Sequence, residues 1–578
     1  MSLHSKQISK DIIKALSNIV GPENLTLDLE VRWTYAFGGS IFVSSWIPDV
    51  VIMPETTNQV SSVLRIANEN KIPVVARGSG TSLSSGHLAS SGGILLDLSK
   101  MNRIILIDIK NNLAIVEPGV ICDDLNKKLI ERGYFFPPDP GSSSICTIGG
   151  MVATNAGGIQ AFKYGVTRDY VLKLEVVMAN GTIINFGSEV LKSVSSYNIK
   201  DLFVGSEGTL GIITKIFLKI RPYPKERKLG LYIFRDMAAL MEAVISLRKE
   251  AIIPCLMEFL DEMTAEKTFE FLGGEFLDYP KGNILLAEVD GFNPSEVNED
   301  FKKMNETIIK KQPLFSIIAE NLDEREKLIH ARKAALPALA RIGPTCCLED
   351  CSVKITNLGE VVEKISKIPE SIGSNRIMVA TFGHLDGNIH PTFLFNENDP
   401  KDVADFEKAM DFLYKKIILP ARGSVTGEHG IGRIKSSYIE LEHGKEVVKI
   451  MNDLKKTLDP NMILNPGVGK GGNKVVIAKR TFRTLINLPN KTLKLNCIRC
   501  GFCNSECPSR INYKYEAFTP RGRLSLLNGI IFGEIKLENS GLINKIFHTC
   551  MLCGNCQVTC PAGVPTIYIF EKTRELLH

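Results

Sequence analysis

FPPDPGSSSICTIGGMVATNAGG, residues 136–158, is dense in glycine, serine and proline and shows no obvious helical or strand period. A loop of this length inside a folded domain is either disordered or binds a ligand. Its small apolar residues argue against disorder, because disordered segments contain few residues that can be buried. The stretch therefore predicts a ligand site in the N-terminal half of the chain.

Alternating helices and strands flank this stretch on both sides. Residues 54–70 predict a helix, with Thr and Gln at capping-box spacing, and residues 8–20 predict a short amphipathic helix. Strands are predicted at 72–78, 94–99, 113–119 and 174–181 and within 205–220, and a further helix at 123–132. The pattern indicates one domain that contains the long loop.

Two more glycine-rich segments lie in the same domain: RGSGTSLSSG at 77–86 and GSEGTLGIIT at 205–214. The first follows a strand, so its successive backbone amides could hold a pyrophosphate. Alone it is a weak signal, since it matches neither G-x-G-x-x-G nor the P-loop spacing, and an ordinary Gly/Ser turn is the simpler interpretation. Three such segments together favour one extended ligand lying against backbone.

The composition changes near residues 222–224, where amphipathic helices (236–250 and 322–340) begin to alternate with strands (284–290 and 377–384). This predicts an α+β domain that ends near the glycines of NPGVGKGG, residues 465–472. The predicted units are therefore an N-terminal helical segment (1–45), the glycine-rich domain (46–223), the α+β domain (224–470), a linker (471–485) and a C-terminal module (486–578).

The C-terminal module contains two copies of C-x2-C-x2-C-x3-C-P. A zinc site takes four ligands in pairs, whereas three thiolates at intervals of three fit three corners of an iron–sulfur cube. In the two-cluster ferredoxin pattern the last cysteine of each run crosses to the other cluster. Paired zinc sites or a disulfide framework are the alternatives, and the duplicated runs with Pro508 and Pro561 make them improbable.

We thus expect two 4Fe-4S clusters. One is assigned to Cys497, Cys500, Cys503 and Cys560, and the other to Cys550, Cys553, Cys556 and Cys507. The remaining six cysteines are expected to be unpaired thiols in a reducing compartment.

Length, charge and hydropathy narrow the class of protein. At 578 residues the chain needs three or four domains. Of the net charge of +5, residues 481–578 carry +6 and the rest −1, which suits a basic wrapper around anionic clusters. A nucleic-acid site is not indicated, since no aromatic-interleaved basic patch is seen.

Without a signal-peptide or membrane-spanning pattern, a cytoplasmic location is expected, with peripheral attachment to the inner face of the membrane through a partner as a further option.

Four motifs together resemble one known family: VIMPETTNQV, VARGSGTSLSSG, PPDPGSSSICTIGGMVATNAGG and GSEGTLGIIT. They are similar to the motifs of FAD-binding type 4 flavoproteins, the vanillyl-alcohol oxidase or PCMH-type group, and especially of its glycolate oxidase and D-lactate dehydrogenase branch. HLDGNIHP and GSVTGEHGIG extend the resemblance over roughly residues 45–468. It implies a two-part FAD-binding domain, a ferredoxin-like α+β substrate (cap) domain and a small, mainly helical 4Fe-4S domain.

The resemblance also implies which residues hold FAD. The pyrophosphate would lie on the first loop: Arg77, Gly78, Ser79, Gly80, Thr81 and Ser82. The flavin side would pack on Gly149, Gly150, Asn155, Gly157 and Gly158, and the adenine and ribose end on Gly205, Glu207, Gly208, Thr209 and Ile213. Some members tether FAD through a histidine of the first loop; residues 77–82 contain none, so noncovalent FAD is expected, with His87 as an ordinary loop histidine.

His384, His390 and the pair Glu428–His429 fall in glycine-flanked loops of a chain with only nine histidines. Two imidazoles and a carboxylate suit zinc, iron or manganese, although the spacing alone leaves a metal site undecided. In 2-hydroxyglutarate dehydrogenase-like relatives, the matching positions of His384, His390 and Glu428 bind a divalent metal and that of His429 acts as base. These roles are chemically compatible, because a Lewis-acidic metal lowers the pKa of the substrate hydroxyl and a neighbouring imidazole removes its proton.

Two departures from the family pattern bear on this site. Relatives usually read H-x-G-D-G-N-x-H, whereas HLDGNIH is one residue shorter, and a deletion in a ligand loop could displace His384 or abolish metal binding. Lys354 stands where proline is usual, either as a second pocket charge or as a solvent-facing lysine. Arg332 matches the family's carboxylate-binding arginine, and without the resemblance it would be an exposed helix residue.

The sequence thus predicts an FAD-dependent dehydrogenase that oxidises a small D-2-hydroxy acid, D-lactate or glycolate, to the 2-oxo acid. A flavin can release electrons singly, so the clusters would pass them on to a partner protein or quinone. The chain stops soon after the second cysteine run, at His578, which favours a separate accepting chain. The alternatives are an electron-transfer subunit with a decayed hydroxy-acid site and, less compatible with clusters, a non-redox flavin synthase.

Overall fold

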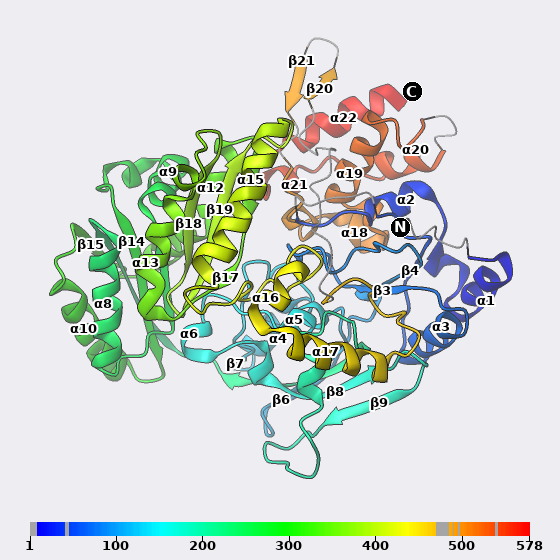
Figure 1. The fold of residues 1–578 in the computed structure, drawn as a ribbon, viewed down its shortest axis with the longest axis horizontal. Helices are drawn as coiled ribbons and strands as arrows, with labels where there is room; N and C mark the ends of the chain where they lie inside the picture. Colours follow the sequence, from blue (N-terminus) through cyan, green and yellow to red (C-terminus); the bar gives the residue numbers. More distant parts are fainter. Residues whose placement is uncertain are drawn as a thin grey trace.

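A computed structural model describes residues 8–40, 46–469, 485–488, 491–494, 497–537 and 541–577. The predicted linker, 471–485, lies outside these residues except for its last position, as do the ends of the predicted 1–45 segment. In Figure 1 the green cap domain stands beside the blue and cyan N-terminal domain, and the orange and red C-terminal helices lie over the latter.

The N-terminal domain is built on two main sheets, as the two-part prediction requires, and the smaller takes its edge strand β1 from the 1–45 segment. A further two-stranded sheet pairs β7 (Tyr134–Phe135) with β11 (Arg221–Pro222). The smaller main sheet, in the order β1-β2-β4-β3, contains Leu25–Thr26, Val50–Ile52, Ile94–Asp97 and Val74–Arg77. β2 and β3 both run parallel to β4, with α3 (Thr57–Glu69) as the crossover and α1 (Lys10–Val20) packed on α3. Apolar side chains from both helices and from β2 and β4 build this core. The first loop follows β3 directly.

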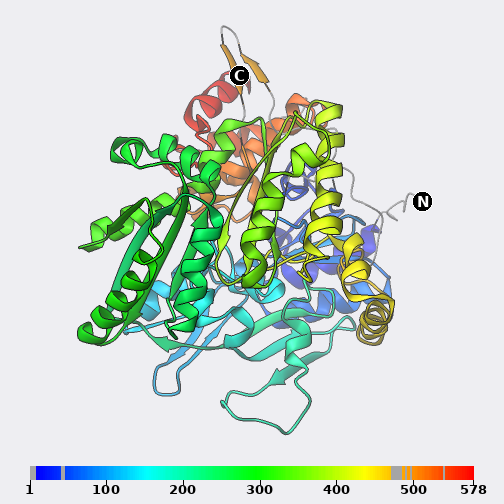
Figure 2. The ribbon, with the colours of Figure 1, turned by 60° about the vertical axis from the view of Figure 1, so that its left-hand side comes forward.

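The larger sheet is antiparallel, in the order β5-β6-β10-β8-β9. Its strands are Ile104–Asp108, Leu113–Val116, Ile212–Lys219, Val171–Val177 and Ile183–Gly187. Its core is covered by α4 (Cys122–Ile130) and α5 (Ile148–Thr154), and Figure 2 shows the sheet at the base of the molecule.

Helix α5 corrects the prediction of an element-free loop at 136–158. Thr147 caps it through a hydrogen bond from the Gly150 amide to Thr147 Oγ1, and Asn155 ends it in the left-handed conformation, with a φ of 54°. Glycine has a low intrinsic helix propensity, so the paired glycines concealed the helix. Packing of Ile148, Met151 and Val152 in the core stabilises it.

The cap domain is one antiparallel sheet with helices on both faces. Its strand order is β15-β12-β14-β13-β18-β19-β16, with β17 paired to β19. The strands are Phe315–Ile318, Glu226–Phe234, Asn283–Gly291, Leu256–Leu260, Met378–His384, Asn388–Phe395, Thr345–Leu348 and Cys351–Ser352. One face carries α8 (Met237–Lys249), α10 (Pro294–Ile309), α13 (Ile355–Ser366) and α15 (Pro400–Phe412). The other carries α9 (Glu262–Leu272), α11 (Leu322–Lys333) and α12 (Ala335–Ile342).

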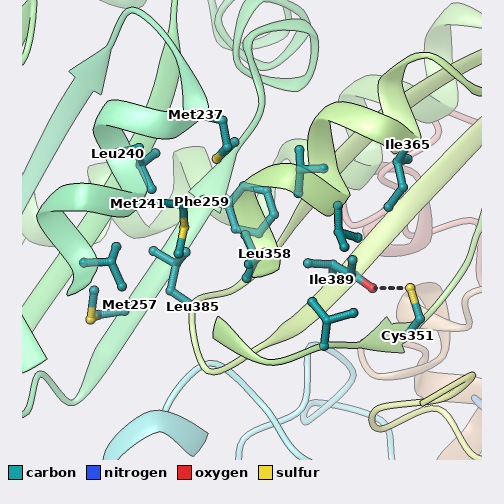
Figure 3. Packing of buried hydrophobic residues seen from close by; sticks show 14 of the residues in the cluster. Met237, Leu240, Met241, Met257, Phe259, Cys351, Leu358, Ile365, Leu385 and Ile389 are labelled. Atoms are coloured by element: carbon teal, nitrogen blue, oxygen red, sulfur yellow. Dashed lines mark hydrogen bonds between the residues drawn. The ribbon is translucent and has the colours of Figure 1, made fainter. Parts of the chain in front are cut away.

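Figure 3 shows the first of these cores, where Met241 and Leu358 of the helices meet Phe259 and Ile389 of the sheet. These four side chains are buried, and each contributes about 1.5–3 kcal/mol relative to exposure. The core fixes β13, β18 and β19, the strands that carry the site described below.

After the cap sheet the chain returns to the N-terminal domain. Helix α17 (Lys445–Leu458) donates from Lys455 Nζ to Thr209 O, and Leu464 forms a parallel bridge with Val74 of β3. The end of the predicted 224–470 domain therefore packs on the FAD-binding domain rather than on the cap.

The C-terminal module is mainly helical, as predicted. It contains α18 (Pro508–Asn512), α19 (Pro520–Ile531), α20 (Gly541–His548), α21 (Asn555–Val558) and α22 (Thr566–Leu577), preceded by strands β20 (Leu485–Leu488) and β21 (Lys491–Lys494). Helix α2 (Leu29–Thr34) of the N-terminal segment shares its core and packs on α19, where Trp33 Nε1 donates to Ser525 O at 2.9 Å. The N-terminal segment thus joins the module to the FAD-binding domain (Figure 1).

Candidate functional site

His384, His390 and Glu428 converge despite being drawn from two strands and a loop. Their donor atoms lie within 4.8 Å of one another. The Nε2 atoms of His384 and His390 lie 3.4 and 3.3 Å from Glu428 Oε1. This donor set fits a divalent metal, because two imidazoles and a carboxylate supply three ligands around a common centre.

The one-residue deletion does not separate the two histidines. Strand β18 ends on His384, β19 begins at Asn388, and Phe382 pairs with His390, so the two imidazoles lie on one face of a tight hairpin. The shorter turn is accommodated at Gly387, which has a φ of 118°. The deletion thus falls in the turn, and His384 and His390 both lie beside Glu428.

Asp350 holds the loop that carries Glu428 and His429. Its Oδ2 accepts hydrogen bonds from the amides of Gly427, Glu428 and His429 at 2.8, 3.1 and 3.0 Å, and from Thr426 Oγ1 at 2.7 Å. Burial raises the pKa of Asp350, but its interactions with His429 and with the charged Lys435 outweigh this and hold the pKa below its usual value. A buried carboxylate with four donors fixes the loop.

His429 is a buried imidazole beside the two other histidines. Its ring stacks on that of His390, with centroids 5.1 Å apart, and its Nε2 lies 3.8 Å from Glu428 Oε1. Burial lowers the pKa of His429 to about 4, more than nearby Asp350 raises it. The imidazole is therefore unprotonated at neutral pH and can accept a proton.

Glu258 of β13 is a buried carboxylate shared by two site residues. It contacts His384 Nδ1, and its Oε2 lies 2.6 Å from Arg332 Nε. A carboxylate on the second ring nitrogen orients a metal-binding histidine. Arg332 is buried in α11 and packs over the Phe382 ring, so it is not an exposed helix residue. Lys354, in contrast, is exposed and precedes α13.

The first loop, residues 77–82, lies between the N-terminal segment and α5. Arg77 donates from Nη1 to Phe37 O, while a Cβ on Gly78 would stand 2.3 Å from Thr147 Oγ1, so the loop touches the start of α5. A Cβ on Gly80 would meet the Arg77 guanidinium. Thr81 and Ser82 are half-buried, and Ser82 Oγ lies 3.0 Å from Ser84 Oγ.

The second and third segments meet around α5. Gly149 and Gly150 form its first turn, Asn155 caps it, and Gly157 and Gly158 follow. The amides of Gly205 and Glu207 donate to Val152 O and Ala153 O on its last turns. Gly208 has a φ of 69°, and Thr209 Oγ1 donates to Ser206 O. Ile213, by contrast, lies in the core of the larger sheet.

All three segments also touch the Glu428–His429 loop. Ser84 Oγ donates to His429 O at 3.0 Å, and a Cβ on Gly157 would lie 2.7 Å from Glu428 Oε2. The Gly432 amide donates to Glu207 Oε1 at 2.9 Å, and burial raises the pKa of Glu207 to about 7. The Glu207 side chain therefore faces the segment that follows the Glu428–His429 pair.

Orphan polar atoms test whether the first loop fits FAD. Arg77 Nη2, Ser79 Oγ and Ser85 Oγ are buried and have no hydrogen-bond partner among the described residues. Such groups are rare in folded proteins, so these atoms are available to hydrogen-bond a polar ligand or ordered water. His87 lies just beyond the loop; burial, aided by the charges of Arg77 and Arg521, lowers its pKa well below 6.5. The loop fits a pyrophosphate.

The two cysteine runs share one backbone turn. The Arg499 amide donates to Cys497 Sγ and the Leu552 amide to Cys550 Sγ, at 3.4 and 3.5 Å. The residue after each first pair, Gly501 or Gly554, is left-handed, with a φ of 88° or 86°. Turns of this kind direct successive thiols to one side, which suits a cubic cluster.

The fourth cysteine of each run lies with the other run. Burial raises the pKa of Cys500 to about 12, and the thiols of Cys497 and Cys560 add to the rise. Burial likewise raises the pKa of Cys556, with Cys550 and Cys507 as neighbours. We call the group around Cys500 the proximal set and the group around Cys556 the distal set. The proximal set is Cys497, Cys500, Cys503 and Cys560; the distal set is Cys507, Cys550, Cys553 and Cys556.

Family models match three parts of the chain. Residues 48–187 match an FAD binding domain, residues 223–468 the C-terminal domain of FAD linked oxidases, and residues 494–564 a 4Fe-4S dicluster domain. The glycolate oxidase subunit GlcD of Bacillus subtilis is 40% identical over 478 residues, 82% of this chain and 100% of that protein. This chain belongs to the FAD-linked oxidase family. It is an oxidoreductase that combines FAD-binding and iron–sulfur domains.

Other relatives of this FAD-linked oxidase agree in length and fold. A D-lactate dehydrogenase of Anaerostipes hadrus is 31% identical over 472 residues, 80% of the oxidase chain and 97% of that protein. Among solved structures, p-cresol methylhydroxylase with substrate bound has a TM-score of 0.65 at 18% identity and covers 80% of the chain and 96% of its own. Alkyldihydroxyacetonephosphate synthase has a TM-score of 0.63 at 19% identity, covering 79% and 86%. These two structures confirm the PCMH-type fold.

The described helices of the oxidase include none that is long and apolar enough to span a membrane. Sequence reasoning missed Glu258 and Asp350, which hold site residues in place, and Arg521, whose Nη2 donates to Ser79 O of the first loop. Each acts on a segment far away in the chain, and no local motif surrounds them. The only available signal was a carboxylate within an apolar stretch, as for Glu258 in LMEFL (256–260), because buried charges need partners.

Proposed function

We propose that this oxidase converts a small D-2-hydroxy acid, D-lactate or glycolate, to the 2-oxo acid. The observation that carries the proposal is the contact of the Glu428–His429 loop with all three flavin segments, through Ser84, Gly157 and Glu207. A substrate beside His429 would lie next to the flavin. The named activities of the glycolate oxidase subunit and D-lactate dehydrogenase relatives support this substrate class.

His429 takes the hydroxyl proton of the substrate in this proposal. Its imidazole is neutral at pH 7 because burial lowers its pKa to about 4, and Asp350 fixes its backbone. His384, His390 and Glu428 would hold one divalent metal (zinc, iron or manganese), which supplies a Lewis acid for the hydroxyl oxygen. A base within reach of the proton contributes about 10²–10⁴-fold to the rate.

Arg332 binds the substrate carboxylate. Glu258 occupies its Nε edge at 2.6 Å, which leaves the two Nη groups, and these donate to no described residue. A guanidinium matches a carboxylate in a two-pronged arrangement. Glu258 thus orients Arg332 and His384 together, so one carboxylate positions both the anion-binding group and a metal ligand.

Noncovalent FAD on residues 77–82, 149–158 and 205–209 would accept the hydride and release electrons singly. Two 4Fe-4S clusters on the proximal and distal sets would carry these electrons to a partner protein or quinone. The proximal set faces the FAD-binding domain: a cavity of about 70 Å³ is lined by Cys497 and Cys500, by Gly39 and Leu83, and by cap strand β16. The distal set includes the exposed Cys553. With clusters bound, electrons would therefore enter at the proximal set and leave at the distal set.

An anaerobic absorbance titration of the cluster-replete protein tests the proposal. D-lactate, glycolate and D-2-hydroxyglutarate are added in turn while flavin and iron–sulfur bands are followed together, with L-lactate as the control. One of the D-2-hydroxy acids or glycolate should bleach the flavin first and the clusters afterwards. If dithionite alone reduces both, the hydroxy-acid proposal is wrong and the chain is a relay.

A further inference from the structure

Arg521 of α19 reaches from the C-terminal module into the first loop of the FAD-binding domain. Its side chain is buried, at 4% exposure. Nη2 donates to Ser79 O at 2.7 Å and Nη1 to Gly80 O at 3.4 Å, while Nε donates to Glu516 Oε1 at 2.6 Å. One guanidinium therefore holds two consecutive carbonyls of the loop expected to carry the pyrophosphate.

The same guanidinium lies against the proximal set. A Cβ on Gly501, inside the first cysteine run, would stand 2.7 Å from Arg521 Nη1. Burial lowers the pKa of Arg521, but Glu516 and the nearby thiols of Cys503 and Cys500 outweigh it and raise the pKa. A four-thiolate cluster is anionic, so it would hold the cation in place. Arg521 thus touches the protein surroundings of both cofactors.

Arg523, two residues further along α19, provides an internal control. It is also buried, but its Nε donates to Ile546 O at 2.8 Å and its Nη2 to Thr549 Oγ1 at 3.1 Å. Its charge neighbours are Cys550, Cys507 and Cys556 of the distal set. None of its hydrogen bonds within the described residues reaches any of the three glycine-rich segments proposed to hold FAD. The two arginines therefore serve different cysteine sets.

We propose that Arg521 is a positioning residue that couples FAD binding to the proximal cluster. The proposal rests on the placement of FAD on residues 77–82 given under the proposed function. By holding the carbonyls of Ser79 and Gly80, Arg521 fixes the orientation of the peptide units that present amides to the pyrophosphate. The cluster in turn fixes the guanidinium. Coupling of this kind is reciprocal: FAD stabilises the proximal cluster by the factor by which the cluster strengthens FAD binding.

The FAD dissociation constant measures this coupling directly. The probe is FAD itself, titrated by fluorescence quenching into protein that retains its clusters after the flavin has been removed. Hydrogen bonds to a charged group are strong, so Arg521→Met should weaken FAD binding about 10- to 100-fold. Arg521→Lys retains the charge but loses the two-pronged geometry, and should give a smaller loss. Arg523→Met should leave the FAD dissociation constant within about twofold of the wild-type value.

The cysteine sets give the second measurement. Cys500→Ser, which removes a proximal ligand, should weaken FAD binding, whereas Cys553→Ser in the distal set should not. Conversely, removal of FAD should speed the release of iron to a chelator from one cluster and not from the other. If Arg521→Met folds poorly, Arg521→Lys and the cysteine pair decide the question.

Equal FAD dissociation constants for the wild type and the Arg521 variants would overturn the proposal, as would an equal loss in Arg523→Met. Neither readout involves a substrate. A protein that binds FAD in an Arg521-dependent manner but reacts with no hydroxy acid would contradict the proposed reaction alone, while the reverse result would contradict only the coupling.

Discussion

The proximal and distal cysteine sets have the same spacing and the same backbone turn, but different surroundings. Three parts of the chain enclose the proximal set: the cavity beside it is lined by Leu83 of the FAD-binding domain, by strand β16 of the cap and by Cys497 and Cys500. The cavity of about 20 Å³ at the distal set is lined only by residues of the C-terminal module, 506–570. Identical ligand spacing therefore does not imply identical surroundings, and in the proposed electron route the proximal set is the entry and the distal set the exit.

Removing one ligand from each set is the strongest test of this difference. In Cys500→Ser, substrate should still reduce the flavin, but the distal cluster should no longer become reduced, since its source of electrons is interrupted. In Cys553→Ser, flavin and proximal cluster should both still be reduced. Stopped-flow absorbance with electron paramagnetic resonance separates the two cases. Reduction of the distal cluster at an unchanged rate in Cys500→Ser would reverse the assigned order.

His429→Gln should reduce the flow of electrons from substrate to both cysteine sets equally. The rate of flavin reduction by substrate should fall about 10²–10⁴-fold, because the variant lacks the base that takes the hydroxyl proton. Dithionite should still reduce both clusters, and the FAD content should not change. His443→Gln is the matched control: this histidine is largely exposed, and its Nε2 lies 3.5 Å from Glu442 Oε1. Comparable losses in both variants would show that His429 is not the base.

Glu258→Gln should affect the metal site and leave both cysteine sets unchanged. The variant keeps the shape of the side chain but removes the charge shared by His384 and Arg332. Metal affinity, measured by competition with a chelator, should fall about 10- to 100-fold, with a rise in KM. Glu288→Gln is the control, because Glu288 is a buried carboxylate of the neighbouring strand and pairs with Arg325 and Arg227 instead. An equal loss of metal affinity in both variants would contradict the role proposed for Glu258.

Trp33→Phe should give the smallest effect and act on both sets together. The variant removes the hydrogen bond from the indole to Ser525 O and should lower the local stability of α19 by about 1 kcal/mol. Faster hydrogen–deuterium exchange throughout α19, which carries both Arg521 and Arg523, is the expected readout. Exchange that quickens near only one set would mean that the module does not move as one body.

Local motifs could be predicted from the sequence, and long-range partners could not. The cysteine spacing led to the pairing of Cys560 with the first run, and the strands and helices around residues 50–130 were largely anticipated. In contrast, Glu258 lies 126 residues from His384, and Arg521 lies 442 from Ser79. No periodicity encodes such pairs, because tertiary packing alone brings them together. The same holds for the hydrogen bond from the Gly432 amide to Glu207, which joins residues 225 positions apart.

Two local details escaped prediction for other reasons. Helix α5 was concealed by Gly149 and Gly150, whose low helix propensity is overridden by the buried face of the helix. The shortened His384–His390 loop looked damaging in the sequence, because a deletion between ligands ordinarily shifts one of them. Here both histidines belong to paired strands, so the pairing register, not the loop length, sets their separation.

The contact between Trp33 and Ser525 also constrains how the protein is made. The two residues are 492 positions apart, so at 5–20 residues per second the ribosome needs about 25–100 s to produce the second after the first. Throughout that interval Trp33, Val31 and Phe37, which the finished protein buries against the module, have no module to cover them. The nascent chain thus exposes an apolar surface that a chaperone can recognise. This surface can be buried only after the cysteine runs have been translated. Its burial therefore indicates that synthesis has reached the iron-binding module.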